Sequence, residues 1–243
     1  MGQFFAKDWT GEPFVIFGPP HTVALILVLL SNLSLMRLRR VSPQARKIFR
    51  YALATVLVVN ESVWHGWNFS IGRWTLQTML PLHLCSMLVW VSAFMLFTEN
   101  YRLYEYIYFF GIGAATQALL TPDAGIYGFP HFRFFQTIIS HGSIVAAAVY
   151  MTVVEGYRPH WMSLVRVAIA GNVYMAFVGL VNWLLGSNYM FIARKPDTPS
   201  LIDVLGPWPW YILSLEAIGA IVFLILYLPF AVRDWRTKTV SVA

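Results

Sequence analysis

The chain of 243 residues holds a single cysteine, Cys85, and several ionisable side chains that lie, like the cysteine, in apolar stretches. Placing an ionisable group inside an apolar segment costs free energy, so such a residue is first considered a functional candidate and only then a structural one. A cysteine becomes a nucleophile when a neighbouring histidine takes its proton. The residues that could serve such a cysteine are Glu61, His65, His83, His141 and Glu216.

Glu61 and His65 are four residues apart in the segment NESVWH. On a helix this spacing places both side chains on one face, where a carboxylate can hold the tautomer and orientation of an imidazole. A structural ion pair is the simpler interpretation of this spacing taken alone. The pair also fits the orienting half of a catalytic site.

His83 and Cys85 occur in the segment LPLHLC, where Pro81 fits the first turn of a helix. Residues two apart point roughly 200° from each other around a helix, so His83 is a poor base for Cys85. Cys85 would lie about one turn into the helix, near its positive end. Either His141 or His65 could complete a Cys–His pair with it.

The same side chains also permit a zinc site, since His65, His83 and His141 with Glu61 or Glu216 are ligand types that zinc accepts. Their spacing is not diagnostic, and no HExxH motif occurs. We therefore predict neither a metal nor another cofactor.

The elements that must position these residues are membrane spans. Hydrophobic residues make up 58% of the chain and charged residues 12%, too little polar surface for a soluble globule. The net charge of +6 is explained by basic residues between apolar runs, so no nucleic-acid partner is expected. The sequence predicts an all-α membrane protein, a bundle of seven transmembrane helices near residues 20–36, 49–68, 79–97, 104–120, 137–154, 163–185 and 208–230.

The distribution of basic residues predicts the orientation of the bundle. If the loop RLRRVSPQARKIFR lies in the cytoplasm, 12 of the 17 Lys and Arg residues lie on the cytoplasmic side and 5 lie outside, as the preference of basic residues for the cytoplasm requires. The N-terminal segment 1–19 then lies outside and the tail 231–243 in the cytoplasm. Two long loops, near 121–136 and 186–207, lie outside. We expect residues 1–243 to form a single transmembrane bundle domain in the cell membrane.

With this orientation the polar residues gather near the outer ends of five helices. Cys85, His141, His65 and Glu61 are the catalytic candidates. Four further residues at that level or in the outer loops are predicted to bind substrate: His83, Asn182, Tyr189 and Glu216. Interhelical hydrogen bonding is the competing interpretation, above all for Asn182.

Several segments resemble a known family: LPLHLC at 80–85, SHG at 140–142, GSNYMFIARKP at 186–196 and LGPWPWY at 205–211. They resemble the bacterial integral membrane family of the YwaF/TP0381 type over about residues 15 to 235. That family is distantly similar to eukaryotic transmembrane cysteine-dependent acyltransferases of ether phospholipids. The resemblance implies that Cys85 is the nucleophile that accepts the acyl group and that His141 is its partner.

Three functions therefore compete. The first is lipid acyl transfer, in which Cys85 and His141 move an acyl chain between phospholipids or to a lysophospholipid and Asn182 donates to the developing oxyanion. The second is non-enzymatic transport or binding of a small molecule or lipid. The third is a zinc-dependent membrane lipid hydrolase. The partners expected are the bilayer and a phospholipid or lysophospholipid substrate.

Overall fold

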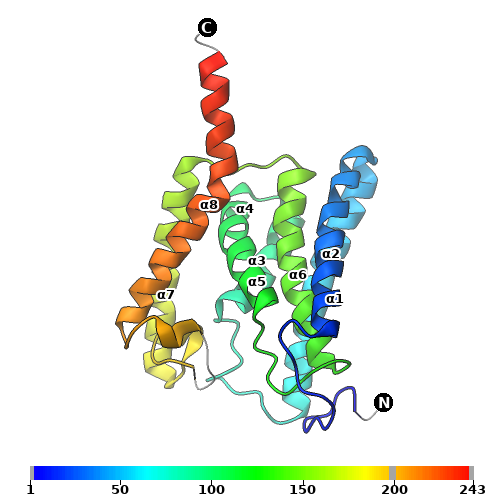
Figure 1. Ribbon diagram of the computed structural model, residues 1–243, viewed down its shortest axis with the longest axis vertical. Coiled ribbons are helices and arrows are strands. Elements are labelled where there is room, and N and C mark those ends of the chain that lie inside the picture. The colour runs from blue at the N-terminus through cyan, green and yellow to red at the C-terminus, as the bar shows by residue number, and fades with distance from the viewer. Residues whose placement is uncertain (1–2, 197–200, 241–243) are drawn as a thin grey trace. The chain divides into compact units, whose positions relative to one another are not determined.

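The computed structural model describes residues 3–196 and 201–240, and these ranges contain helices and no strand (Figure 1). The all-α prediction is confirmed for this part of the chain. The α-helices are α1 Pro19–Ser34, α2 Pro43–Ser70, α3 Leu84–Thr98, α4 Tyr101–Tyr106, α5 Ile112–Leu120, α6 Phe132–Val153, α7 Trp161–Leu185 and α8 Trp210–Val240. Shorter turns are η1 Leu35–Arg40, η2 Ile107–Gly111, η3 Tyr189–Phe191 and η4 Leu201–Val204.

Every predicted span corresponds to a helical segment, and η2 joins α4 to α5 into one of them. Four boundaries differ from the prediction by five residues or more, and one of them is the start of α6, at Phe132 instead of near residue 137. The second helix begins earlier, at Pro43, because Ser42 caps it and Pro43 is its first residue. The third begins later, at Leu84, and α8 continues past residue 230 to Val240.

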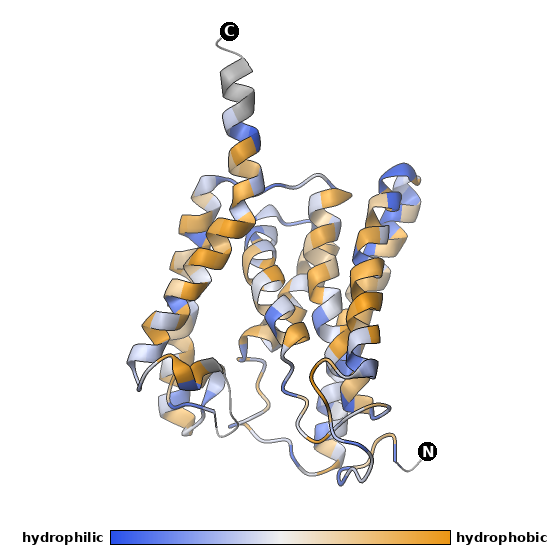
Figure 2. Cartoon of the chain, in the orientation of Figure 1, coloured by the Kyte–Doolittle hydropathy of each residue, from blue (hydrophilic) through white to orange (hydrophobic). Residues whose placement is uncertain are grey.

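Four helical segments are long and apolar enough to cross a membrane: Pro19–Arg40, Phe132–Val153, Trp161–Leu185 and Trp210–Trp235. Leu84–Thr98 is apolar but shorter. Hydrophobic residues dominate these helices (Figure 2), and large apolar side chains are exposed along α1, α7 and α8. Surfaces of this kind are stable when they face lipid. The count of seven spans, the outside N-terminus and the cytoplasmic C-terminus stay predictions.

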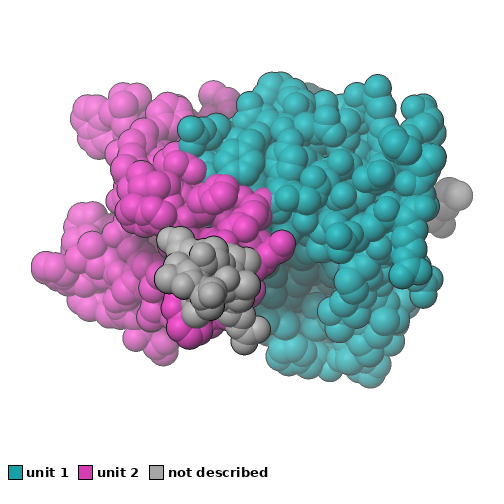
Figure 3. All heavy atoms as spheres, turned by 90° about the horizontal axis from the view of Figure 1, so that it is seen from above, with its two compact units in different colours: residues 1–74, 84–157 teal, residues 75–83, 158–243 magenta. Residues whose placement is uncertain are grey.

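The contacts divide the chain into two compact units (Figure 3). Unit 1 comprises residues 1–74 and 84–157, and unit 2 comprises residues 75–83 and 158–243. The nine-residue segment 75–83 therefore belongs with the C-terminal part of the chain, although it precedes α3. The prediction of a single bundle domain stays a prediction.

In unit 1, α2 packs against α3 and α6, and α6 also packs against α1 and α5. The buried core between these helices is apolar and includes Leu57, Leu88 and Ile144. Two helices approach closely at Gly142 of α6, where a Cβ atom would lie 3.1 Å from Cγ2 of Val28 in α1. Glycine at this position therefore sets the separation of α1 and α6.

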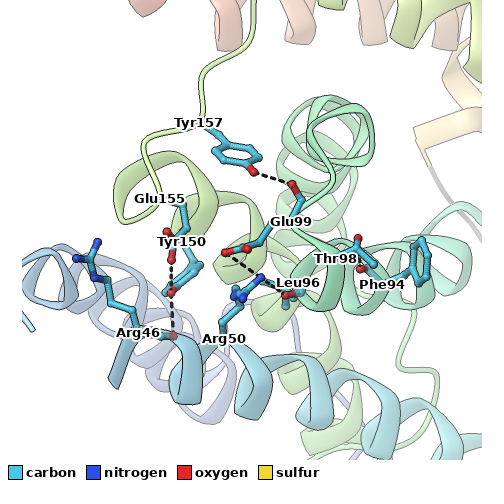
Figure 4. A network of polar contacts seen from close by, with 9 residues as sticks. All are labelled: Arg46, Arg50, Phe94, Leu96, Thr98, Glu99, Tyr150, Glu155 and Tyr157. Atoms are coloured by element: carbon cyan, nitrogen blue, oxygen red, sulfur yellow. Dashed lines mark hydrogen bonds and ion pairs between the residues drawn. The ribbon is translucent and has the colours of Figure 1, made fainter. Parts of the chain in front are cut away.

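A polar network joins the ends of α2, α3 and α6 at the side of unit 1 where α2 begins (Figure 4). Arg50 is buried, donates to the carbonyl of Leu96 at 2.7 Å and pairs with the Glu99 carboxylate at 3.0 Å. Tyr150 donates to the Glu155 carboxylate at 2.6 Å, and Tyr157 donates to the Glu99 carbonyl at 2.6 Å. The buried guanidinium is thus paired, as a charge in an apolar environment requires.

The predicted orientation can be tested by labelling a single introduced cysteine. In a Cys85→Ala background, we expect Ser42→Cys to react with an impermeant maleimide only after the cells are permeabilised. The basic residues on both sides of position 42 are the reason, since such loops stay in the cytoplasm. Gly125→Cys, in the predicted outer loop, is the matched control and should react in intact cells. The reverse pattern would invert the orientation.

Candidate functional site

Glu61 and His65 lie together on α2, with His65 Nε2 3.6 Å from Glu61 Oε1. The indole N–H of Trp74, which follows the helix, donates to His65 Nδ1 at 3.0 Å. An N–H group can only donate, so Nδ1 of a neutral His65 is the acceptor and Nε2 carries the hydrogen toward Glu61. The Nδ1 atom of His65 is therefore occupied by Trp74, whereas Nε2 lies beyond hydrogen-bonding distance of Glu61 Oε1.

Cys85 is the second residue of α3 and is partly buried. The negative charge of Glu61 acts on its thiol, and the neighbouring Ser86 side chain is within hydrogen-bonding reach of the same carboxylate. The Glu61 carboxylate therefore acts electrostatically on the start of α3. Its Oε1 atom is buried and accepts no hydrogen bond from the residues that the structure describes.

The placement of Pro81 and His83 on the third helix is wrong. α3 begins at Leu84, so Pro81 precedes it and Cys85 lies in its first turn. The residues before the helix are held by other partners: the N–H of Leu80 donates to the Tyr189 hydroxyl at 2.9 Å. Cys85 is consequently closer to the positive end of the helix than the sequence indicated.

His141 lies on α6 and is also partly buried. Its Nδ1 atom lies 2.8 Å from the carbonyl of Thr137, one turn earlier. Because a carbonyl only accepts, Nδ1 carries the hydrogen and Nε2 of the neutral ring presents a lone pair. No hydrogen bond joins His141 to Cys85 within the described ranges. The two residues nevertheless belong to the same unit, on helices that pack against each other.

Arg133, the second residue of α6, is a further charged residue near Glu61 and His141. Its guanidinium lies 4.1 Å from the ring centroid of Trp64, a cation–π contact between α6 and α2, and donates to Oε1 of Gln136. Its positive charge acts on Glu61 and on His141. An arginine in the first turn of an apolar span, followed by glutamine three residues later, was the signal that could have identified it.

The four predicted substrate-binding residues all belong to unit 2. The carboxamide of Asn182, on α7, is buried between polar groups of the following loop: Nδ2 donates to the Tyr189 carbonyl at 2.9 Å, and Oδ1 accepts from the Tyr189 N–H and the Ser187 hydroxyl, both at 2.8 Å. These bonds hold the loop onto α7.

Tyr189 extends this arrangement to the segment 75–83. Its hydroxyl donates to the Leu76 carbonyl at 2.7 Å and accepts from the Leu80 N–H. Burial raises the pKa of the Tyr189 phenol, which keeps the hydroxyl protonated and able to donate. Nδ1 of His83 accepts the N–H of Met190 at 3.3 Å, and the His83 ring packs edge-on against Tyr189 with centroids 5.2 Å apart.

Glu216 lies on α8, partly buried, and its Oε1 atom accepts no hydrogen bond from the residues that the structure describes. The substrate-binding roles of His83, Asn182, Tyr189 and Glu216 stay predictions. For zinc, the described residues contain no group of three His, Cys, Asp or Glu side chains close enough to hold a metal ion.

Comparison with known proteins gives one match. No curated protein and no solved structure is significantly similar to the chain. A family model for the TMEM164 family matches residues 16–227, which include the helices from α1 through most of α8 and every residue of the Cys85 cluster. Together with the long apolar helices, this identifies a membrane protein. The chain belongs to the TMEM164 family.

Proposed function

We propose that this chain is a cell-membrane lipid acyltransferase of the kind that the YwaF/TP0381 resemblance implied, with Cys85 as its nucleophile. One observation carries the proposal. α2, α3 and α6 pack against one another in unit 1, and they carry a cysteine in the first turn of a helix, a buried carboxylate and an imidazole with an open lone pair. An acyl-transfer site needs a nucleophile, a base and polar groups that orient them.

Between the two candidate bases, the hydrogen bonds favour His141. Nδ1 of His65 already accepts the Trp74 N–H, and its Nε2 hydrogen points toward Glu61, so the neutral ring has no lone pair for the Cys85 proton. Nε2 of His141 has one, since Nδ1 is the donor to Thr137. We expect Nε2 to reach Sγ of Cys85 directly or through one water when substrate is bound.

The proposed reaction has two halves. The Cys85 proton passes to Nε2 of His141, and the thiolate attacks the ester carbonyl of a phospholipid. The ester C–O bond breaks, the leaving alkoxide takes the proton from His141, and a thioester remains on Cys85. His141 then removes the proton of a lysolipid hydroxyl, which attacks the thioester, and the proton returns to the Cys85 sulfur. Glu61 and His65 position the cluster, and no cofactor enters any step.

The test is the acyl-enzyme itself. Purified protein incubated with a diacyl phospholipid, without a lysolipid acceptor, should gain the mass of one acyl chain, located on the peptide that contains Cys85. Neutral hydroxylamine should remove this mass, because it cleaves thioesters. Cys85→Ala should gain none. Protein that never carries an acyl group, although it turns over or moves the same lipid, would replace this proposal with transport, binding or direct hydrolysis.

A further inference from the structure

The connection between α1 and α2 carries a dense group of cations. Five of them, Arg37, Arg39, Arg40, Arg46 and Lys47, fall within eleven residues, and the stretch from Pro13 to Asn60 contains no Asp or Glu. We call residues 35–48, which comprise η1 and the start of α2, the basic hairpin. It forms a hydrophilic tip at the connection between the two helices (Figure 2).

Within the described residues, the cations of the basic hairpin form no ion pair with an acidic side chain. Arg50, the next basic residue along α2, shows the contrast, since it is buried and paired with Glu99 (Figure 4). Arg37, Arg39 and Arg40 are exposed and form no ion pair or side-chain hydrogen bond with any residue that the structure describes. Their positive charge is therefore available to an external anion.

The local geometry concentrates this charge. In the 3₁₀ turn η1, residues three apart are eclipsed, so Arg37 and Arg40 lie on one side of it. α2 begins directly afterwards and has no acidic residue in its first turn, so the positive end of its dipole is not compensated. An anion beside the hairpin would meet guanidinium groups and a helix N-terminus together.

Exposed apolar side chains border these cations. Leu33 and Met36 are each 53% exposed on one side of the hairpin, and Ile48 is 60% exposed on the other. Basic side chains above an apolar band are arranged as at a membrane interface, where the stems cover hydrocarbon and the charged ends reach the headgroups. A nucleic acid or a soluble anion would leave the apolar band without a partner.

We propose that the basic hairpin is a binding site for the phosphate group of an anionic phospholipid, whose acyl chains lie along the exposed apolar side chains of α1 and α2. Charge complementarity selects an anionic headgroup, and the apolar band selects a lipid over a free phosphate. The inference concerns the end of α2 opposite to Glu61 and does not depend on the proposed acyl transfer.

The experiment measures lipid selectivity in detergent solution. Fluorescent phosphatidylglycerol and a phosphatidylcholine with the same acyl chains are titrated into wild-type protein and into the triple variant Arg37→Gln, Arg39→Gln, Arg40→Gln. We expect wild type to prefer phosphatidylglycerol, with an affinity that falls steeply as salt rises. The triple variant should lose at least roughly tenfold in phosphatidylglycerol affinity, with little change for phosphatidylcholine.

The matched control removes three cations elsewhere, with Lys7→Gln, Arg194→Gln and Lys195→Gln, and should retain wild-type selectivity. An equal loss in both triple variants would show a general effect of net charge and overturn the proposal. Wild type that does not distinguish the two lipids would also overturn it, as would soluble glycerol phosphate binding as tightly as the lipid. If the triple variant does not fold, Arg39→Gln and Arg40→Gln measured singly must each show part of the loss.

Discussion

Cys85→Ser is expected to reduce acyl transfer by at least roughly a hundredfold while the protein remains folded. A hydroxyl is close in size to a thiol, so packing at the start of α3 should change little, but serine is a far weaker nucleophile without strong activation. His141→Ala should be comparably damaging, since a positioned acid–base group contributes roughly 10²–10⁴-fold. Lipid acyl exchange measured with purified, reconstituted protein is the readout, and the thermal midpoint controls for folding.

Combining the two changes tests whether the residues act as one unit. If they do, the double variant should be scarcely slower than either single variant, because loss of one member already disables the other. His65→Ala and Glu61→Gln serve as controls on the neighbouring helix and should leave substantial activity if these residues only position the cluster. If His65→Ala reduced acyl-transfer activity as much as His141→Ala, His65 would be assigned as the base instead. Unchanged acyl exchange in Cys85→Ser and His141→Ala would end the acyltransferase proposal.

Asn182→Leu is expected to destabilise the protein by about 3 kcal/mol. Leucine fills a similar volume, but the N–H and carbonyl of Tyr189 and the hydroxyl of Ser187 lose their partner inside the protein. Each buried polar group left without a hydrogen bond costs about 1–3 kcal/mol, and partial access to water reduces the sum. Unfolding in a mixed-micelle denaturant titration, followed by tryptophan fluorescence, measures the loss.

Asn172→Leu is the matched control for this substitution. Asn172 lies on the same helix, ten residues earlier, and is exposed with its amide donating only to the carbonyl of Ala168. Removing it leaves no buried group without a partner, so the change in stability should stay within about 0.5 kcal/mol. Equal effects at positions 172 and 182 would mean that the Tyr189 loop does not depend on Asn182.

The helices could be predicted from the sequence because their apolar runs are long and turn-forming residues separate one run from the next. The relation of Glu61 to His65 was also accessible, since spacing on one helix determines it. The start of the third helix could not be predicted, because the segment before it is held by side chains more than 90 residues away. Tyr174 donates to the Leu82 carbonyl, and the Tyr189 hydroxyl donates to the Leu76 carbonyl and accepts from the Leu80 N–H. The hydrophobic pattern of the sequence cannot show that distant side chains bind these backbone groups in place of a helix.

The side-chain contacts between different helices could likewise not be predicted from the sequence. Nothing in the spacing of Trp64 and Arg133 indicates that the guanidinium stacks on the indole ring, or that Trp74 occupies Nδ1 of His65. The Trp74 contact matters for the proposed chemistry because it occupies the lone pair of a neutral His65. The candidate residues could thus be identified from the sequence, whereas the proposal of His141 over His65 as the base depends on the hydrogen bonds of the folded structure.

The split of unit 2 along the chain has a consequence for biosynthesis. Residues 75–83 leave the ribosome well before Tyr174 and Tyr189, which come 92 to 113 positions after their hydrogen-bond partners. Until then the backbone groups of Leu76, Leu80 and Leu82 must be satisfied by water or by the insertion machinery. Contacts of such long sequence separation form late, so unit 1 can assemble first while this segment waits for its partners. A nascent chain arrested before residue 174 would therefore expose the segment 75–83, the part of the fold most open to quality-control proteases.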